Sequence, residues 1–449
     1  MSLRPSRFVF TDRSYDPQSG EIRLGYALDD QPLIERFFLP VGLSPHPDTA
    51  NAIEAALTLL HWIAGVSYWK TYCPSQWVFR ANGPNAQQAS ALNTIYKKGL
   101  AEFAWHNQLD LDERIDCPSD ASHEPLVHGH QQAPSAGLGT GVLLPLGGGK
   151  DSLVAWHHAQ SVVPKEQLMT VQVGTAPLIQ SLGEWMVSEG LVHKHWVIRR
   201  EMDPALSMMN AEGAMNGHVP ITAINAAVLT VFALALNAHW VVFANERSAD
   251  EATLIDSAGE PINHQFSKSF EFEVLFDDWI KRYVASDLSV FSALRPWREL
   301  AIVREFSQLT PFHHHFSSCN RNFHIDPNAR GTSPWCGRCP KCHFVFLAMA
   351  VFLPPQKMVA IFGADLLDQS DCIDGFQSLL ALDGAKPFEC VGEAAEARVA
   401  VLALSASADW KDHRVVKQLA PMLSNLDVPS LEEMLKPTGP HLLPEALQP

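Results

Sequence analysis

A glycine-rich stretch in the middle of the chain, LLPLGGGKDSLVAWHHA at residues 143–159, decides how the fold is interpreted. Its three glycines separate a short apolar run from a segment of helical composition. Glycine lets a backbone approach an anion closely, and a helix N-terminus offers free N–H groups together with a partial positive charge. The stretch therefore predicts a strand, a phosphate-binding loop and a helix. The alternative is an ordinary glycine turn in which Asp151 only caps the helix.

The residues of this loop indicate how a phosphate group would be held. The glycine backbone forms a cradle, a lysine reaches a phosphate oxygen, and a hydroxyl group donates a hydrogen bond. An aspartate would repel a bare phosphate, so its presence indicates a bridging Mg²⁺. The loop is not a P-loop, because Asp151 follows Lys150, and it lacks the G-x-G-x-x-G dinucleotide fingerprint. The predicted contacts are Gly147, Gly148, Gly149, Lys150, Asp151 and Ser152.

Strands and helices are expected to alternate along this part of the chain. The pattern predicts strands over 141–146, 167–174, 193–200 and 239–246, and helices over 150–162, 178–190 and 221–238. Such alternation is typical of an α/β fold with a doubly wound, mostly parallel sheet. Ligands bind these sheets at the carboxyl ends of the strands. Residues that follow strand ends should therefore lie beside the glycine loop, and they are Gly174, Asn245 and Glu246.

The rest of the chain is expected to form two further regions. The segment 6–40 is β-rich and begins as a hairpin, and a helix that Asp48 or Thr49 could cap follows it. Residues 84–108 are also expected to be helical. The stretch 117–141 is rich in Pro, Ser, Gly and His, as linkers are. The predicted division is an α+β N-terminal domain at 1–135, an α/β domain at 136–310 that carries the phosphate-binding loop, and a cysteine-bearing, helical C-terminal region at 311–449.

Composition limits the classes of function. The 449 residues carry a net charge of −16, which disfavours nucleic acid as a partner because that interaction needs a basic surface. The most apolar segment, 221–244, contains Asn225, Asn237 and His239. We therefore expect a buried helix followed by a buried strand rather than a membrane span. No apolar signal segment opens the sequence, so we expect a cytoplasmic protein.

The cysteines point to a metal rather than to disulfide bonds. Cys336, Cys339 and Cys342 form the motif C-G-R-C-P-K-C, and Cys319 lies upstream. Four thiolates can close a tetrahedral Zn²⁺ site. We favour structural zinc over an iron–sulfur cluster, and either over buried thiols without a metal. A histidine of residues 313–315 could replace Cys319 as the fourth ligand.

Three other segments carry groups that could clamp a carboxylate or transfer a proton. Arg247 follows a predicted strand, His264 and Lys268 lie in N-H-Q-F-S-K-S-F, and His218 lies just before the apolar helix. Each has a plain structural explanation as well. Arg247 could belong to a helix cap, the charges of 264–268 could be solvated, and a lone histidine is more often structural.

The glycine loop closely resembles the S-G-G-x-D-S loop of the PP-loop superfamily of ATP pyrophosphatases. Gly148, Gly149, Asp151 and Ser152 match that pattern, whereas Gly147 stands where the pattern has a serine. The resemblance implies cleavage of ATP between its α and β phosphates and activation of a carboxylate or carbonyl group as an adenylate.

A wider resemblance covers nearly the whole chain. GVSYWKTYCP, GGGKDS, GHVPITAIN, NERSAD, HQFSKSFEFE and CGRCPKCHFVF together are similar to the MurL-type, ATP-dependent epimerases of UDP-N-acetylmuramoyl-L-alanyl-L-glutamate in bacterial peptidoglycan synthesis. This implies conversion of the terminal L-glutamate to D-glutamate through an acyl-adenylate, with release of AMP and pyrophosphate. The UDP-linked muramoyl dipeptide would be the partner, and ATP and Mg²⁺ the cofactors. Candidates for the clamp and the acid/base groups are His218, Arg247, His264 and Lys268.

Two alternatives and one assignment stay open. Another PP-loop enzyme, making a nitrile or amide on a deazapurine or thiolating tRNA, would share the loop and the cysteines. A nucleotide-sensing protein would bind ATP without turnover. Aromatic residues of the N-terminal domain could stack on the UDP-sugar, although aromatics at such spacing more often form core. They are Trp62, Tyr68, Trp69 and Tyr72.

Overall fold

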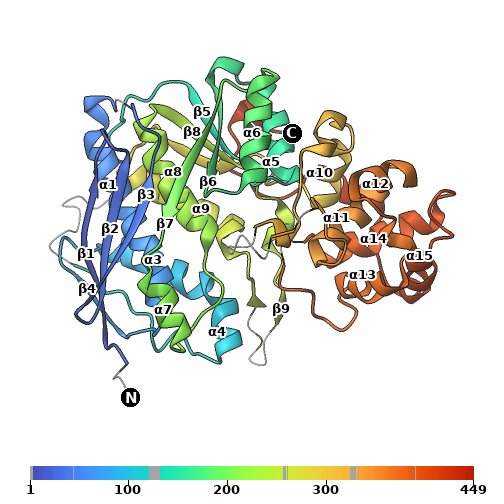
Figure 1. Ribbon diagram of the computed structural model, residues 1–449, viewed down its shortest axis with the longest axis horizontal. Helices are drawn as coiled ribbons and strands as arrows, with labels where there is room; N and C mark the ends of the chain where they lie inside the picture. Colours follow the sequence, from blue (N-terminus) through green and yellow to red (C-terminus); the bar gives the residue numbers. More distant parts are fainter. Residues whose placement is uncertain are drawn as a thin grey trace.

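The protein is built on one continuous nine-stranded sheet, in the order β11-β8-β5-β6-β7-β3-β2-β1-β4 (Figure 1). The computed structural model describes residues 4–43, 45–120, 132–255, 259, 261–323, 330–331, 333–389 and 391–449. The strands are β1 Arg7–Tyr15, β2 Glu21–Leu28, β3 Gln31–Phe38, β4 Gln76–Phe79, β5 Gly141–Pro145, β6 Leu168–Val173, β7 Lys194–Glu201, β8 Ala238–Phe243 and β11 Ser289–Ser292. Residues 121–131 of the predicted linker lie outside the described residues.

The centre of the sheet is parallel. β5 pairs in parallel with β6 and β8, β6 pairs with β7, and β8 pairs with β11. Successive side chains of a strand point to opposite faces, and in β5 Val142 and Leu144 enter one apolar cluster while Leu143 enters the other. Both faces are therefore covered, as an apolar parallel sheet requires. The predicted mostly parallel α/β sheet is confirmed.

The N-terminal strands extend this same sheet. The predicted hairpin is confirmed as β1 and β2, and β3 follows as a third antiparallel strand. β3 then pairs antiparallel with β7. The Arg200 guanidinium on β7 donates to the buried Glu35 carboxylate on β3 at 2.6 Å. The sheet thus runs without interruption from the predicted N-terminal domain into the predicted α/β domain at 136–310.

Helices cover the two faces (Figure 1). One apolar cluster contains residues of α1, α3, α8 and α9, and the other contains residues of α5, α6, α10 and the C-terminal helices. The helices of the first two thirds of the chain are α1 Ala50–Ala64, α2 Val66–Trp69, α3 Ala86–Gly99, α4 Ala101–Asn107, α5 Lys150–Gln160, α6 Pro177–Ser188, α7 Ala205–Ala211, α8 Ile221–Ala235, α9 Phe270–Tyr283 and α10 Glu299–Phe306.

The structure confirms the predicted segment 221–244 and corrects the predicted cap of α1. The predicted buried helix and strand over 221–244 are confirmed as α8 and β8. In the described part of the chain, no helix has both the length and the apolar character that crossing a bilayer requires. The predicted cap of α1 is wrong in its chemistry: Thr49 occupies the N-cap position, but its hydroxyl donates to the His46 carbonyl at 2.7 Å instead of accepting from the helix.

A mainly helical region forms the C-terminal end, at the right of Figure 1. Its helices are α11 Pro340–Ala350, α12 Pro355–Phe362, α13 Ile373–Leu379, α14 Ala394–Ala406, α15 Arg414–Leu419 and α16 Leu431–Met434. The chain beyond α16 returns to the α/β part, where the Thr438 N–H donates to the Pro296 carbonyl at 2.8 Å. The expected helical C-terminal region is therefore present and packs on the α/β part.

Candidate active site

A cavity of about 820 Å³ opens at the carboxyl ends of the parallel strands. The glycine loop after β5, the end of β6 and the residues after β8 all line it, as the topology of a parallel sheet predicts. The lining includes Gly147, Gly149, Asn245 and Glu246 from the sequence predictions. Gly174, which follows β6, has a φ of +103° and faces open space, but it lies outside the cavity lining.

The glycine loop has the conformation that its sequence requires. Gly148 has a φ of +79°, a region that favours glycine. Gly149 is the N-cap of α5, and no side chain caps that helix. A Cβ atom at Gly149 would lie 2.7 Å from the Ser318 hydroxyl, whereas one at Gly147 would meet nothing within 4 Å. The loop is thus closed on one side by residue 318 and open to the cavity on the other.

Lys150 belongs to the cavity wall, and its buried ammonium group lies between two carboxylates. Its ammonium group contacts Asp151 at 2.5 Å and forms a shorter contact with Glu299 at the start of α10. Although burial opposes the charge, these two carboxylates raise the pKa of Lys150. Burial and the neighbouring Asp151 charge raise the pKa of Glu299 well above its usual range. The predicted lysine–phosphate contact stays a prediction, and Ser152, whose hydroxyl donates to the Gly149 carbonyl at 3.1 Å, also lines the cavity.

Charged groups from distant segments complete the lining. Lys268 comes from the turn before α9, Lys341 from the first turn of α11, and Glu389 from the segment before α14. Only the first of these was predicted from the sequence. Lys341 stands inside the cysteine motif, so its place near a predicted metal site was the one available signal. Lysines and carboxylates around a glycine loop can hold a polyphosphate together with a divalent cation.

The two predicted histidines come together, but, like Arg247, neither is among the residues that line this cavity. The rings of His218 and His264 are 6.3 Å apart. Nδ1 of His218 lies 3.2 Å from the Glu102 carboxylate on α4, and Nδ1 of His264 lies 2.8 Å from the Thr253 hydroxyl. Burial is the main cause that lowers the pKa of each histidine to about 4. Both imidazoles are therefore neutral near pH 7 and able to accept a proton.

Arg247 lies apart from this group. It is not among the residues that line the cavity. Its guanidinium forms a short contact with the Thr438 hydroxyl, and its backbone N–H donates to the Trp297 carbonyl at 2.9 Å. In this structure Arg247 links the turn after β8 to the C-terminal segment, and its predicted role as a clamp stays untested.

The four predicted cysteines form one cluster. The sulfur atoms of Cys319, Cys336, Cys339 and Cys342 all lie within 4.8 Å of one another. Hydrogen bonding with Cys319 and Cys342 lowers the pKa of the Cys339 thiol. Of the neighbouring histidines, His313 is bonded to the Phe306 carbonyl at 3.1 Å and His315 stacks on Trp185. The alternative in which a histidine of residues 313–315 replaces Cys319 stays untested.

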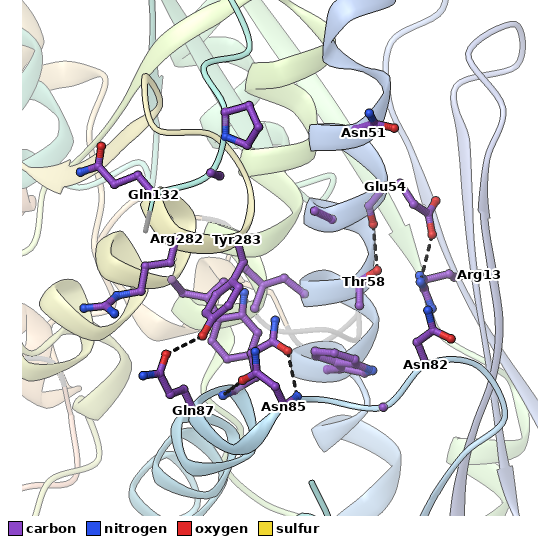
Figure 2. Close-up of a pocket in the computed structure, with 18 residues that line it drawn as sticks. Arg13, Asn51, Glu54, Thr58, Asn82, Asn85, Gln87, Gln132, Arg282 and Tyr283 are labelled. Carbon is purple, nitrogen blue, oxygen red and sulfur yellow. Dashed lines mark hydrogen bonds and ion pairs between the residues drawn. The ribbon is translucent and has the colours of Figure 1, made fainter. Parts of the chain in front are cut away.

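A second cavity, of about 650 Å³, lies near the amino ends of the strands (Figure 2). Residues 132–134, which lead into β5, and Tyr283, which precedes β11, are part of its wall. Its functional groups largely bind one another: Arg13 pairs with Glu54 at 2.9 Å, and the Tyr283 hydroxyl donates to Gln87 at 2.7 Å. Trp62 lines it, whereas Tyr68 and Trp69 are fully buried and Tyr72 is partly buried. We therefore place the candidate active site at the glycine loop.

The fold and the site define the chain as a doubly wound α/β protein with a glycine loop that opens on a cavity at the carboxyl edge of its sheet. Comparison with known protein families identifies the family of this chain. The MurL N-terminal domain family matches residues 2–293, and the MurL C-terminal domain family matches residues 315–433. The chain belongs to the MurL family, and the predicted membership is confirmed.

Three curated relatives span nearly the whole chain, and each is named UDP-N-acetyl-alpha-D-muramoyl-L-alanyl-L-glutamate epimerase. The protein of Xanthomonas oryzae pv. oryzae (strain MAFF 311018) is 40% identical over 98% of this chain and 96% of its own length. The protein of Micromonospora sp. is 36% identical over 98% and 96%. That of Salinispora tropica is 37% identical over 93% and 88%.

Proposed function

We propose that this chain inverts the α-carbon of the terminal glutamate of UDP-N-acetyl-α-D-muramoyl-L-alanyl-L-glutamate, and that ATP activates the substrate for this step. The observation that carries the proposal is the likeness to three epimerases of that name, at 36–40% identity over almost the full length. The cavity supports it because one opening brings together an uncapped helix N-terminus, carboxylates and lysines.

The chemistry explains why an epimerase of this substrate would use ATP. Removing the α-proton beside a free carboxylate would add a second negative charge to an anion. Transfer of AMP to that carboxylate releases pyrophosphate and gives a neutral acyl group, which makes the α-proton far more acidic. A modest base can then remove the proton from one face, and a conjugate acid can return one to the other face. Hydrolysis of the acyl-adenylate releases AMP and the D-glutamyl product.

The residues around the glycine loop suit ATP and Mg²⁺. The open side of Gly147 leaves room for a phosphate at the uncapped N-terminus of α5. Asp151 and Glu246 line the cavity, and carboxylate oxygens are the ligands that Mg²⁺ prefers. The bound cation would neutralise the phosphates during departure of pyrophosphate. Lys150 would hold Asp151 and Glu299 in place, since its ammonium group lies between them.

The neutral histidine pair supplies the proton-transfer groups. His218 with Glu102 has the arrangement of a carboxylate-supported base, in which the carboxylate orients the ring and stabilises the imidazolium that forms. His264 lies beside it and is the candidate for the second face. Lys268, which lines the cavity near His264, is placed to bind the glutamate side chain or a phosphate.

The cysteine cluster suits a structural Zn²⁺. Four sulfurs at the corners of a tetrahedron, each about 2.3 Å from the metal, lie about 3.8 Å apart. The Cys336–Cys342 and Cys339–Cys342 sulfur separations are 3.7 and 3.4 Å. These two separations are compatible with tetrahedral zinc, which would tie the segment at Cys319 to α11.

The test combines the protein with Mg-ATP and the UDP-linked muramoyl-L-alanyl-L-glutamate in heavy water. AMP, pyrophosphate, glutamate chirality and deuterium at the α-carbon are followed together. We expect AMP and deuterated D-glutamate to appear in parallel. AMP without inversion would overturn the epimerase assignment, and inversion without ATP would overturn the adenylate.

A further inference from the structure

Lys70 differs from the other buried lysines of the described chain. The ammonium groups of Lys150 and Lys386 each contact a carboxylate. That of Lys70 instead donates to two neutral oxygens, the Gly217 carbonyl at 2.9 Å and the Asn216 side chain at 3.1 Å. Its side chain is only 4% exposed. A buried ammonium group bonded only to neutral acceptors is costly, so its retention calls for a reason.

The position of Lys70 supplies one. Asn216 and Gly217 directly precede His218, so Lys70 holds the turn that carries this imidazole. The neighbouring Thr71 carbonyl accepts from the Met215 N–H at 2.9 Å and ties the same turn to the N-terminal part of the chain. Lys70 also lies over the ring of Phe103, with its nitrogen 5.6 Å from the ring centroid. The adjoining Glu102 contacts His218.

We propose that Lys70 is a positioning residue for the epimerisation: it fixes the turn before His218 and holds a positive charge beside that imidazole, so that His218 meets the substrate as a neutral base. This rests on the proposed function. The charged and titratable groups that face His218 are Glu102 from α4, His264 from the segment before α9, and Lys70. Glu102 favours the imidazolium, whereas the other two disfavour it.

The direction of the electrostatic effect follows from these groups. Burial, the charge of His264 and that of Lys70 lower the pKa of His218 to about 4. Burial also lowers the pKa of Lys70 to about 8, so Lys70 is mostly charged at neutral pH. Removing that charge raises the pKa of His218 and leaves a larger share of the base protonated in mildly acidic solution. The acid limb of the rate profile then moves to higher pH.

Lys70→Gln and Lys70→Arg separate this role from a merely structural one. Glutamine keeps a donor for the turn without the charge, and arginine keeps the charge. Deuterium exchange at the imidazole C2–H, followed by mass spectrometry against pH, reports the pKa of His218 in the intact protein without requiring turnover. Epimerisation of the proposed substrate is measured over the same pH range. Lys97→Gln is the control, because it removes a lysine charge that pairs with Asp112 and that is not among the charges acting on His218 or His264.

In Lys70→Gln we expect the His218 pKa and the acid limb of kcat to rise together by about half a unit or more, while Lys70→Arg stays near the wild type. In the control, the His218 pKa should not move. An unchanged His218 titration in Lys70→Gln overturns the inference. A wild-type protein without epimerase activity overturns the proposed function instead, and the titration still decides whether Lys70 acts on His218.

Discussion

Replacing Lys150 by methionine tests the buried charge arrangement under the glycine loop. Methionine keeps much of the apolar stem of lysine and removes the ammonium group that lies between Asp151 and Glu299. The Lys150 and Glu299 side chains are 2% and 6% exposed, so water compensates poorly for the lost partner. The variant therefore leaves a buried carboxylate beside a second negative charge.

The size of the effect follows from this burial. Removing one member of a buried ion pair costs about 3–5 kcal/mol, because the remaining charge is left without compensation. Glu299 can escape part of that cost by taking up a proton, since burial and Asp151 already raise its pKa. A raised pKa in the folded state stabilises the protein below the usual pKa of the carboxyl group, and this stabilisation is lost as pH rises through the folded-state pKa. The loss in Lys150→Met should therefore be larger at pH 8 than at pH 5.5.

Urea unfolding of the wild type and the variant at both pH values measures this loss. The double variant Lys150→Met with Glu299→Gln is the control, because it removes both charges and should recover most of the stability at pH 8. If Lys150→Met lowers the free energy of unfolding by less than about 1 kcal/mol at pH 8, the reasoning is refuted. Glu299 would then be neutral in the wild type or would reach solvent. An equal loss at both pH values would also contradict the reasoning, because protonation of Glu299 could not then relieve the charge.

Three further perturbations test the site around this pair. Gly149→Ala should displace the loop, because the added methyl group meets Ser318, and should slow AMP formation at least about tenfold. Gly147→Ala should fold normally and mainly raise the KM for ATP, because its methyl group projects into open space. Circular dichroism and initial rates against ATP concentration distinguish the two outcomes. Arg247→Ala should change the AMP rate by less than about threefold while lowering the melting temperature, because this residue contacts the C-terminal segment; a loss of activity with normal stability would restore it as a clamp. Removing metal with a chelator should lower both the melting temperature and the rate of AMP formation, with about one Zn²⁺ released per chain; a metal-free protein of full activity would contradict the zinc assignment.

Much of the fold follows from local sequence pattern. Short apolar runs that alternate with helical segments identify β5, β6, β7 and β8, and the composition of the glycine stretch places the turn at Gly147 to Gly149 between a strand and a helix. These features depend on neighbours within a few residues, so a single sequence contains the information. The pairing of β3 with β7 could not be predicted in this way. It joins segments about 160 residues apart, as in the Glu35–Arg200 pair.

The candidate site likewise contains residues that the sequence could identify and residues that it could not. His218, His264 and Lys268 could be singled out because each lies in an unusual segment, and the structure brings the two histidines together. Glu299 and Glu102 could not, because nothing in their own segments marks them, and Lys70 lies in the distinctive stretch GVSYWKTYCP without any local sign that its charge meets the turn before His218. Glu299 opens an ordinary amphipathic helix, and Lys70 follows a run of aromatic core residues. Their significance depends on the long-range partners Lys150, His218 and Gly217.

The cysteine cluster is connected directly to the glycine loop through residues 317–319. The Ser317 N–H donates to the Gly148 carbonyl at 2.9 Å, and Ser318 closes the loop at Gly149 and lines the cavity. The next residue, Cys319, belongs to the cluster. Across the cluster, Lys341 lies between Cys339 and Cys342 and also faces the cavity. A metal that fixes the four sulfurs would thus set the position of two cavity walls at once, although it takes no part in proton transfer. Substitutions of these cysteines should for this reason impair ATP use and stability together, and leave the contact between His218 and Glu102 of α4 unaffected.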